Sequence, residues 1–216
     1  SRNGCNAIIE TASNNLLTGC KNTIIPNTVT SIGENAFDNN NLTSIEIPNS
    51  VTSINHGAFQ NCGNLTSIEI PNSVTYIGSG AFYYCNALSN VTFESNSQLA
   101  TIESQAFSDC EILTSIAIPS SVTYICENAF IYTKLESISV ESGNTAYDSR
   151  NGCNAIIETS NNRMIIGCKN SSIPNTVQSI AYSAFQYCEG LTDIFIPNSV
   201  TSIDNGAFNG CRDLES

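Results

Sequence analysis

The chain has 216 residues, and 7 basic against 19 acidic residues give it a formal net charge of −12. This excess of negative charge repels phosphate backbones and anionic lipid, so nucleic acid is not expected as a partner. No run of about 18 apolar residues occurs, and membrane insertion is therefore not expected either. Only 12% of the residues are charged, and Ser, Thr and Asn fill most positions between the apolar ones. Such a composition is typical of an extracellular or surface-displayed protein.

The first expected element is a β-hairpin within residues 1–25. The stretch Ala-Ile-Ile-Glu-Thr and a later Leu-Leu pair flank a polar Ser/Asn turn. Cys5 and Cys20 stand on the two sides of this hairpin. A turn centred near 12–13 would place the two cysteines opposite each other, whereas a turn centred on 14–15 would move them out of register. The pattern leaves a Cys5–Cys20 disulfide open.

After the hairpin, one motif recurs about every 23 residues. It contains Ile-Pro-Asn-Ser-Val-Thr-Ser-Ile, then an Ala-Phe pair, a cysteine and Leu-Thr-Ser-Ile. The recurring phenylalanines are Phe37, Phe59, Phe82, Phe107, Phe130, Phe185 and Phe208, each with an isoleucine five residues before it. Such regularity predicts a solenoid of stacked, near-identical coils. We expect each phenyl ring to fill the middle of its coil, so that the rings form a spine.

Within each coil, the Leu-x-x-Ile-x-Ile spacing predicts a short strand. Corresponding strands should stack in parallel, about 4.8 Å apart. Proline ends the strand at Pro48, Pro71, Pro119 and Pro197, since it cannot donate a ladder hydrogen bond. The following Val-x-x-Ile segment is expected to turn the chain inward, and the Ala-Phe pair to form a short helical or 3₁₀ turn.

Residues between the buried positions of these strands must point outward, on the concave side of the solenoid. They form the candidate binding face: Ser44, Glu46, Ser67, Glu69, Asn90, Thr92, Ser115, Ala117, Ser137, Ser139, Asp193 and Phe195. Most of these side chains are small or hydroxylated, which suits a protein or glycan ligand. Phe195 is the one large apolar side chain among them. It is either an anchor for a ligand or an incidental surface aromatic.

A second hairpin module is expected at 141–173, because residues 149–159 repeat residues 1–11 without a change. It replaces an ordinary Cys-x-x-Leu-Thr-Ser-Ile segment. Five of the seven basic residues lie in the two modules and form a candidate basic patch: Arg2, Lys21, Arg150, Arg163 and Lys169. Insertions on a repeat scaffold often contact partners, but a longer repeat can equally serve only to change the curvature of the solenoid.

The ten cysteines fall into three groups. Five follow their phenylalanine by three residues: Cys62, Cys85, Cys110, Cys188 and Cys211. Equivalent positions in stacked coils lie farther apart than the β-carbons of a disulfide, so we expect free, buried thiols. Cys153 and Cys168 repeat the arrangement of Cys5 and Cys20, which leaves a second disulfide open. Cys126 has no evident partner.

No catalytic or metal-binding constellation is recognised. His56 is the one histidine and stands at a variable repeat position, and no Cys-x-x-Cys pair occurs. Neither zinc nor any other cofactor is therefore expected. Carboxylates such as Glu46 and Glu69 recur at one strand position, which indicates a solvated face and not an acid/base pair. We do not expect an enzyme.

The repeated elements resemble the BspA-like leucine-rich repeats, whose pattern is Leu-x-x-Ile-x-Ile-Pro-x-Ser-Val-x-x-Ile-x-x-x-Ala-Phe-x-x-Cys-x-x-Leu. The match covers most of the chain. The resemblance implies a right-handed, curved leucine-rich-repeat solenoid of the α/β type, with short parallel strands on the concave side and short helical or 3₁₀ turns, interrupted by β-hairpin insertions. We expect residues 1–216 to form one solenoid domain and to be a segment of a longer chain.

Proteins of this class are surface-exposed or secreted adhesins, so the resemblance implies non-catalytic adhesion or protein binding at a cell surface. The expected ligand is a host matrix or plasma protein, or another cell-surface protein. Two alternatives stay open: a structural spacer that carries another domain, and a glycan-binding module. Exposed terminal coils would also permit weak edge-to-edge self-association.

Overall fold

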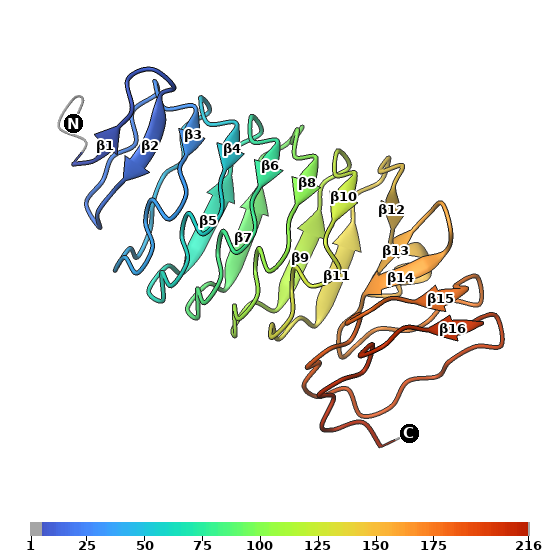
Figure 1. Cartoon of the computed structure of the whole chain (residues 1–216). Helices are drawn as coiled ribbons and strands as arrows, with labels where there is room; N and C mark the ends of the chain where they lie inside the picture. The colour runs from blue at the N-terminus through green and yellow to red at the C-terminus, as the bar shows by residue number, and fades with distance from the viewer. Residues whose placement is uncertain (1–5, 216) are drawn as a thin grey trace.

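A computed structural model describes residues 6–215 as an elongated stack of coils, with the two ends of the chain at opposite ends of the stack (Figure 1). The strands are β1 (Ile8–Ile9), β2 (Asn15–Thr18), β3 (Ser31–Ile32), β4 (Ser53–Ile54), β5 (Ser67–Ile70), β6 (Tyr76–Ile77), β7 (Asn90–Phe93), β8 (Thr101–Ile102), β9 (Ser115–Ile118), β10 (Tyr124–Ile125), β11 (Ser137–Val140), β12 (Tyr147–Asp148), β13 (Ile156–Glu158), β14 (Arg163–Ile166), β15 (Ser179–Ile180) and β16 (Ser202–Ile203). Over this range, the one helical element is the 3₁₀ turn η1 (Arg150–Gly152).

The predicted Leu-x-x-Ile-x-Ile strands form one wall of the solenoid. They are present as β5, β7, β9 and β11, which pair in parallel and in register. Ile68 lies beside Val91, and Ile116 beside Ile138. β7 lies next to β9, so the two strand pairs continue one wall. The equivalent segments toward the two ends of the chain, 42–47 and 191–196, do not form strands.

A second wall is a ladder of very short strands. The Val-x-x-Ile segments, which the sequence predicts only to turn the chain inward, form β3, β4, β6, β8 and β10. These strands also pair in parallel, and the hairpin β1–β2 extends the sheet to seven strands. The second ladder arises because every coil repeats its Ser/Thr-Ile pair at one offset. Backbone N–H groups that face the next coil then find carbonyl partners.

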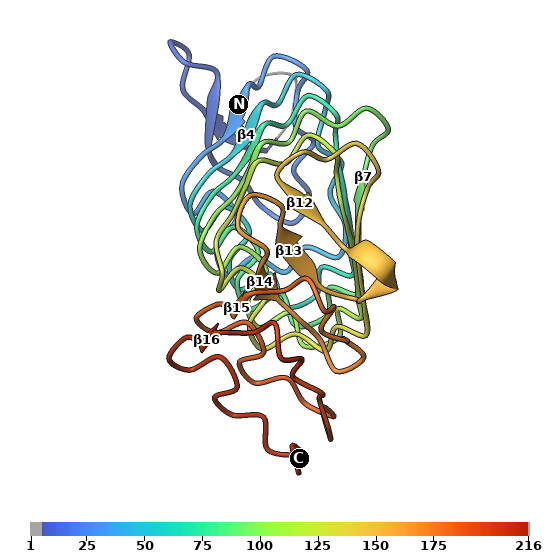
Figure 2. The ribbon, with the colours of Figure 1, turned by 90° about the vertical axis from the view of Figure 1, so that its right-hand side faces the viewer.

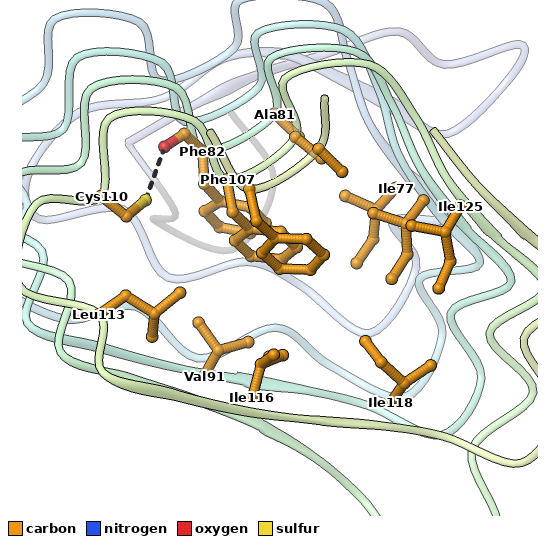
Figure 3. Packing of buried hydrophobic residues seen from close by; sticks show 14 of the residues in the cluster. Ile77, Ala81, Phe82, Val91, Phe107, Cys110, Leu113, Ile116, Ile118 and Ile125 are labelled. Carbon is orange, nitrogen blue, oxygen red and sulfur yellow. Dashed lines mark hydrogen bonds between the residues drawn. The ribbon is translucent and has the colours of Figure 1, made fainter. Parts of the chain in front are cut away.

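Phenyl rings stack along the axis of the solenoid, as their spacing predicts. Phe37, Phe59, Phe82, Phe107 and Phe130 form one continuous stack, with neighbouring ring centroids 5.1–5.3 Å apart. Phe185 and Phe208 form a second stack at 5.0 Å. Figure 3 shows two of the rings between the aliphatic side chains of the walls. Within the described residues, no ring contact joins Phe130 to Phe185, so the spine is interrupted where the second module stands.

Tight turns, and not the predicted helical turn, carry the Ala-Phe pair. In the first coil, the Asp38 N–H donates to the Asn35 carbonyl of its own coil at 3.1 Å. The Phe37 N–H donates instead to Ala58 of the next coil at 2.8 Å. This alternation places left-handed backbone two residues before and two residues after the phenylalanine, at Asn35 (φ 53°) and Asn39 (φ 54°). A helix would use every N–H within its own coil, whereas alternation ties each coil to the next.

The cysteines that follow the phenylalanines are hydrogen-bond donors to the preceding coil. Cys62 Sγ donates to the Phe37 carbonyl at 3.1 Å, Cys85 Sγ to Phe59 at 3.2 Å, and Cys110 Sγ to Phe82 at 3.4 Å (the last bond is drawn in Figure 3). All three thiols are free and buried. A small side chain with a weak donor therefore satisfies a carbonyl at the edge of the aromatic stack.

The hairpin cysteines also carry free thiols where the structure describes them. Cys153 and Cys168 are buried and unlinked, and Cys168 Sγ donates to the Asn154 carbonyl at 3.4 Å. Cys20 is free as well. Cys5 lies outside the described residues.

Each hairpin supplies a glycine where an ordinary coil has its phenylalanine. The Gly167 N–H donates to the Ala184 carbonyl at 2.8 Å, just as the Phe37 N–H donates to Ala58 of the next coil. A β-carbon on Gly167 would lie 2.2 Å from Cε1 of Phe185, and one on Gly19 would lie 2.1 Å from Cε1 of Phe37. The phenyl ring of the next coil thus occupies the space over the glycine, which explains why each stack starts after a hairpin.

The two hairpins have the same sequence in their first strand but differ in burial. Ile8 is 61% exposed, whereas the corresponding Ile156 is 0% exposed. Leu17 is 42% exposed, and its counterpart Ile165 is 1% exposed. In the second module, β12 pairs with β13, and β11 packs against both strands. In the described part of the first module, β1 is the edge strand of its sheet. Neighbouring coils, and not local sequence, decide the burial of these side chains.

Ion pairs hold the second module between the coils on its two sides. Arg163 pairs with Glu127 of the preceding coil and, at 2.7 Å, with Asp204 of a following coil. Lys169 Nζ lies 2.5 Å from Glu136 Oε1. All five side chains are partly exposed. Because a network of charges gives more stabilisation than isolated surface pairs, these contacts help to fix the module in place.

The second module also changes the direction of the solenoid. Tyr147 reaches back to the preceding coil, where its hydroxyl accepts the Ile125 N–H at 3.0 Å. Beyond this contact, β14, β15 and β16 run across the direction of β3–β10 (Figure 1). Figure 2 looks along the stack and shows the last coils displaced from those before them. The module therefore forms a bend between two arrays of coils. The first array contains Phe37 to Phe130, and the second array contains Phe185 and Phe208.

Replacing Gly167 by alanine is expected to lower the free energy of unfolding by about 1–3 kcal/mol, the usual cost of overpacking. The added β-carbon would overlap the ring of Phe185. Gly63→Ala is the matched control, since nothing lies within 4 Å of its added β-carbon, and its effect should stay within about 0.5 kcal/mol. Chemical denaturation followed by circular dichroism measures both variants. Equal stabilities would contradict the packing of Phe185 over Gly167.

Cys62, Cys85 and Cys110 are expected to resist alkylation in the folded protein, whereas the partly exposed Cys20 and Cys126 react. Burial raises the pKa of Cys62 to about 11 and also raises the pKa of Cys85 and of Cys110. Since the thiolate is the reactive form, these thiols are inert at about pH 8 until the chain unfolds. Mass spectrometry of iodoacetamide-treated native and denatured protein locates the label. Labelling of native Cys85 as fast as Cys126 would contradict the burial of these thiols.

Candidate binding surfaces

The predicted binding face is solvent-exposed along its whole length. All twelve residues expected on it, from Ser44 to Phe195, have exposed side chains. Where strands form, these residues stand side by side in adjacent coils: Ser67 by Asn90, Glu69 by Thr92, Ser115 by Ser137 and Ala117 by Ser139. We call these twelve residues the strand face. It presents small polar side chains on a hydrogen-bonded backbone.

A groove of about 740 Å³ runs over the N-terminal part of the strand face. Its lining includes the carboxylates Glu46, Glu69 and Glu94, and no Lys or Arg. The Glu94 carboxylate accepts the Asn72 N–H at 3.0 Å, which fixes the carboxylate at the rim. The groove is therefore a polar, acidic surface suited to a positively charged or hydroxyl-rich ligand.

Phe195 is the most exposed apolar side chain of the strand face, at 79%. It follows the bend, and in the described chain no strand pairing continues from β11 to the segment 191–196. The second module instead packs beside β11. Asp193 and Phe195 thus belong to a different array from the other ten residues, and the strand face has two parts.

The basic residues of the hairpins are mostly engaged within the chain. Arg150 pairs with Asp148 at 2.7 Å, and Arg163 and Lys169 form the ion pairs that hold the second module. Lys21 is exposed, and Arg2 lies outside the described residues. These contacts favour a structural role for the second module over a free basic patch.

The histidine, cysteine and acidic side chains do not gather into a metal-binding group within residues 6–215. His56 is exposed, and over this range no three His, Cys, Asp or Glu side chains are grouped so that they could hold a metal ion. None of the described helical segments is long and apolar enough to cross a membrane.

A column of left-handed residues runs along another side of the solenoid, two positions after each phenylalanine. Its members are Asn39, Asn61, Tyr84, Asp109, Tyr132, Tyr187 and Gly210, all with φ between 54° and 76°. Asn, Asp and Gly tolerate this conformation, but a bulky side chain there costs about 1–3 kcal/mol. We call these positions the left-handed column. Its three tyrosines are strained residues.

Two of these tyrosines meet across the bend. The rings of Tyr132 and Tyr187 are stacked, with centroids 4.1 Å apart and an interplanar angle of 23°. Hydrogen bonding to Tyr187 raises the pKa of Tyr132 to about 12. The Tyr132 phenol is therefore protonated at neutral pH and can donate as well as accept hydrogen bonds.

A pocket of about 280 Å³ opens beside the stacked rings, and we call it the tyrosine pocket. Besides Tyr132 and Tyr187, its polar lining includes Asp109, Glu111, Lys134, Glu189 and Arg212. The sequence alone does not locate this pocket, because its residues come from coils that the second module separates in the chain. The sequence does carry one indication of the pocket: Tyr132 and Tyr187 stand at the repeat position that earlier coils fill with Asn39 and Asn61.

Solved bacterial proteins share this architecture. The pneumococcal vaccine antigen PcpA is similar with a TM-score of 0.81 at 25% identity, over 89% of this chain and 49% of that chain. A leucine rich cell surface protein from Faecalibacterium prausnitzii is 32% identical with a TM-score of 0.68, over 89% of this chain and 59% of that chain. A Treponema (T. pallidum) leucine rich repeat protein, at 22% identity and a TM-score of 0.64 over 100% of this chain and 90% of that chain, supports the fold alone. This chain spans about half of PcpA.

No protein with a curated description matches the chain. The family model described as the BspA type leucine rich repeat region matches it in six copies, over residues 8–137 and 162–216. The unmatched stretch between these ranges contains β12, η1 and β13 of the second module. The matched residues make up most of the chain and confirm the resemblance seen in the repeats. The chain belongs to the BspA-type leucine-rich repeat family.

Proposed function

We propose that this chain is a non-catalytic binding module of a bacterial surface protein, and that it binds a protein ligand through the strand face. One observation carries the proposal: the exposed rows of small polar residues stand on a regular, paired backbone. Such a surface loses little conformational entropy when a ligand binds. Ligand binding through repeat surfaces is also the common use of solenoids.

The charge of the groove indicates the kind of protein ligand. Glu46, Glu69 and Glu94 line it without a basic neighbour, in a chain of net charge −12. A basic segment of the ligand would complement this potential and would associate faster at low salt. Host matrix and plasma proteins with exposed Lys and Arg are candidates for this role.

A surface location agrees with the printed descriptions of the similar proteins. One is a vaccine antigen and another a cell surface protein. We propose that residues 1–216 form one solenoid domain, with the hairpin modules at 1–25 and 141–173 as parts of it.

A spacer that only carries another domain is the second candidate function. The polar, sparsely charged surface and the bend between arrays favour it.

Glu46→Gln/Glu69→Gln is expected to weaken binding to immobilised fibronectin or fibrinogen about tenfold or more, equivalent to about 1.4 kcal/mol. The variant removes two carboxylates from the groove and with them the complementary charge. Biolayer interferometry at low and physiological salt measures the affinity and its salt dependence.

Glu34→Gln/Glu103→Gln is the matched control. It removes the same charge from residues that follow β3 and β8 on the second wall. Equal losses in both double variants would reduce the effect to net charge and contradict a groove-specific site. Asp193→Ala/Phe195→Ala tests the part of the strand face beyond the bend. Absence of saturable binding by the unmodified chain would favour the spacer.

A further inference from the structure

The tyrosine pocket is not part of the strand face, so the protein binding proposed for the strand face does not involve the pocket. Its rings are held in an unfavourable backbone conformation, with φ 59° at Tyr132 and φ 55° at Tyr187. Earlier coils have Asn39 and Asn61 at the same position, where an Asn side chain tolerates left-handed backbone. Strain that a simple substitution would relieve points to a use for the phenol rings themselves.

The rings present an aromatic surface to solvent. Tyr132 packs against Tyr187, yet it remains 40% exposed. A β-carbon on Gly210 would lie 2.4 Å from Cδ1 of Tyr187, so Tyr187 packs closely over this glycine. Tyr187 is thereby supported from the side of the second array while Tyr132 faces it from the first. The pair forms a platform fixed by both arrays.

Hydrogen-bonding groups of both kinds surround the platform. Asp109 and Glu111 supply carboxylate acceptors, and Arg212 supplies guanidinium donors. Lys134 and Glu189 face each other at 3.6 Å and offset each other's charge. With that pair set aside, Asp109, Glu111 and Arg212 leave charges of both signs around the platform, so the rim offers hydrogen-bond acceptors and donors together.

We propose that the tyrosine pocket binds a pyranose ring of a glycan. The C–H face of a pyranose is apolar and stacks on an aromatic ring, while its hydroxyls both donate and accept hydrogen bonds. The pocket pairs these two properties: an exposed tyrosine platform and a rim of carboxylates with an arginine. Its volume of about 280 Å³ lies near the lower limit of small-molecule sites and suits one ring.

The site exists because of the bend. Tyr132 belongs to the last coil of the first array and Tyr187 to the first complete coil of the second. The glycan site is independent of the strand face, so each can fail without the other. Loss of glycan binding in pocket variants, with protein binding retained, separates the two.

Saturation-transfer difference NMR with the methyl glycosides of glucose, galactose, mannose and N-acetylglucosamine, and with sialic acid, tests the proposal. At least one glycoside is expected to bind saturably to the intact chain. Tyr132→Asn/Tyr187→Asn should weaken binding about tenfold or more through loss of stacking. The chain has no tryptophan, so tyrosine fluorescence gives a second titration signal.

Two further variants test whether binding depends on the pocket. Arg212→Gln removes a rim donor without touching the stacked rings and should also weaken binding. Tyr182→Asn is the matched control, because Tyr182 is 52% exposed and lies outside the pocket. If none of the glycosides binds saturably, the proposal is overturned. Binding that survives in both the Tyr132/Tyr187 and the Arg212 variants would overturn it as well.

Thermal stability separates a ligand platform from a structural clamp. Tyr84→Asn relieves left-handed strain at the same column position, outside the pocket lining, and also removes the ring contact with Tyr83, so its Tm gives the net effect of the two changes where no pocket is involved. For the Tyr132/Tyr187 double variant, the relief of strain opposes the loss of the ring contact. A nearly unchanged Tm with binding lost supports the glycan site. A large fall in Tm with binding retained would assign the rings to holding the two arrays together.

Discussion

The stack of phenyl rings is the contact on which the rest of the solenoid depends. Each ring needs a ring of the next coil about one strand spacing away, and the observed separations of 5.0–5.3 Å meet this need. The stack fixes where each coil passes the axis, which brings the two strand ladders and the cysteine thiols into register. The constant distance from isoleucine to phenylalanine in the sequence is therefore a packing constraint. A coil without this phenylalanine cannot join the stack unless the centre is filled in another way.

The second module is such a coil, and its contacts show how the constraint is met. Gly167 leaves the centre of the coil empty of side chain, and the ring of Phe185 enters that space. The phenylalanine stack is interrupted at the module, while ion pairs of Arg163 link the coils on both sides. These contacts do not impose one stacking direction, so the axis bends here. The bend then brings Tyr132 and Tyr187 together.

The sequence predicts well whatever the repeat determines. The ring stack, the fold class and the strands β5, β7, β9 and β11 follow from periodic positions that each coil shares, whereas the segments 42–47 and 191–196 have the same spacing and form no strand. The sequence predicts less well what depends on the second module: the break in the ring stack and the meeting of two tyrosines from different arrays. The second ladder and the left-handed turns are not predictable from the side-chain pattern because they are backbone features. Local sequence does not determine burial either: Ile8 and Ile156 have the same neighbours in the sequence, but β11 packs against the strand of Ile156, whereas Ile8 lies in an edge strand.

The two candidate surfaces use the scaffold in opposite ways. The strand face repeats one small polar pattern in coil after coil, so a ligand there meets many similar contacts and gains affinity from their number. The left-handed column is uniform only in backbone, and its chemistry changes wherever Asn gives way to Tyr. A single strained substitution has a defined place in three dimensions because the coils around it are regular. Selectivity in such a solenoid therefore arises at departures from the repeat, while the repeat supplies the rigidity that makes those departures specific.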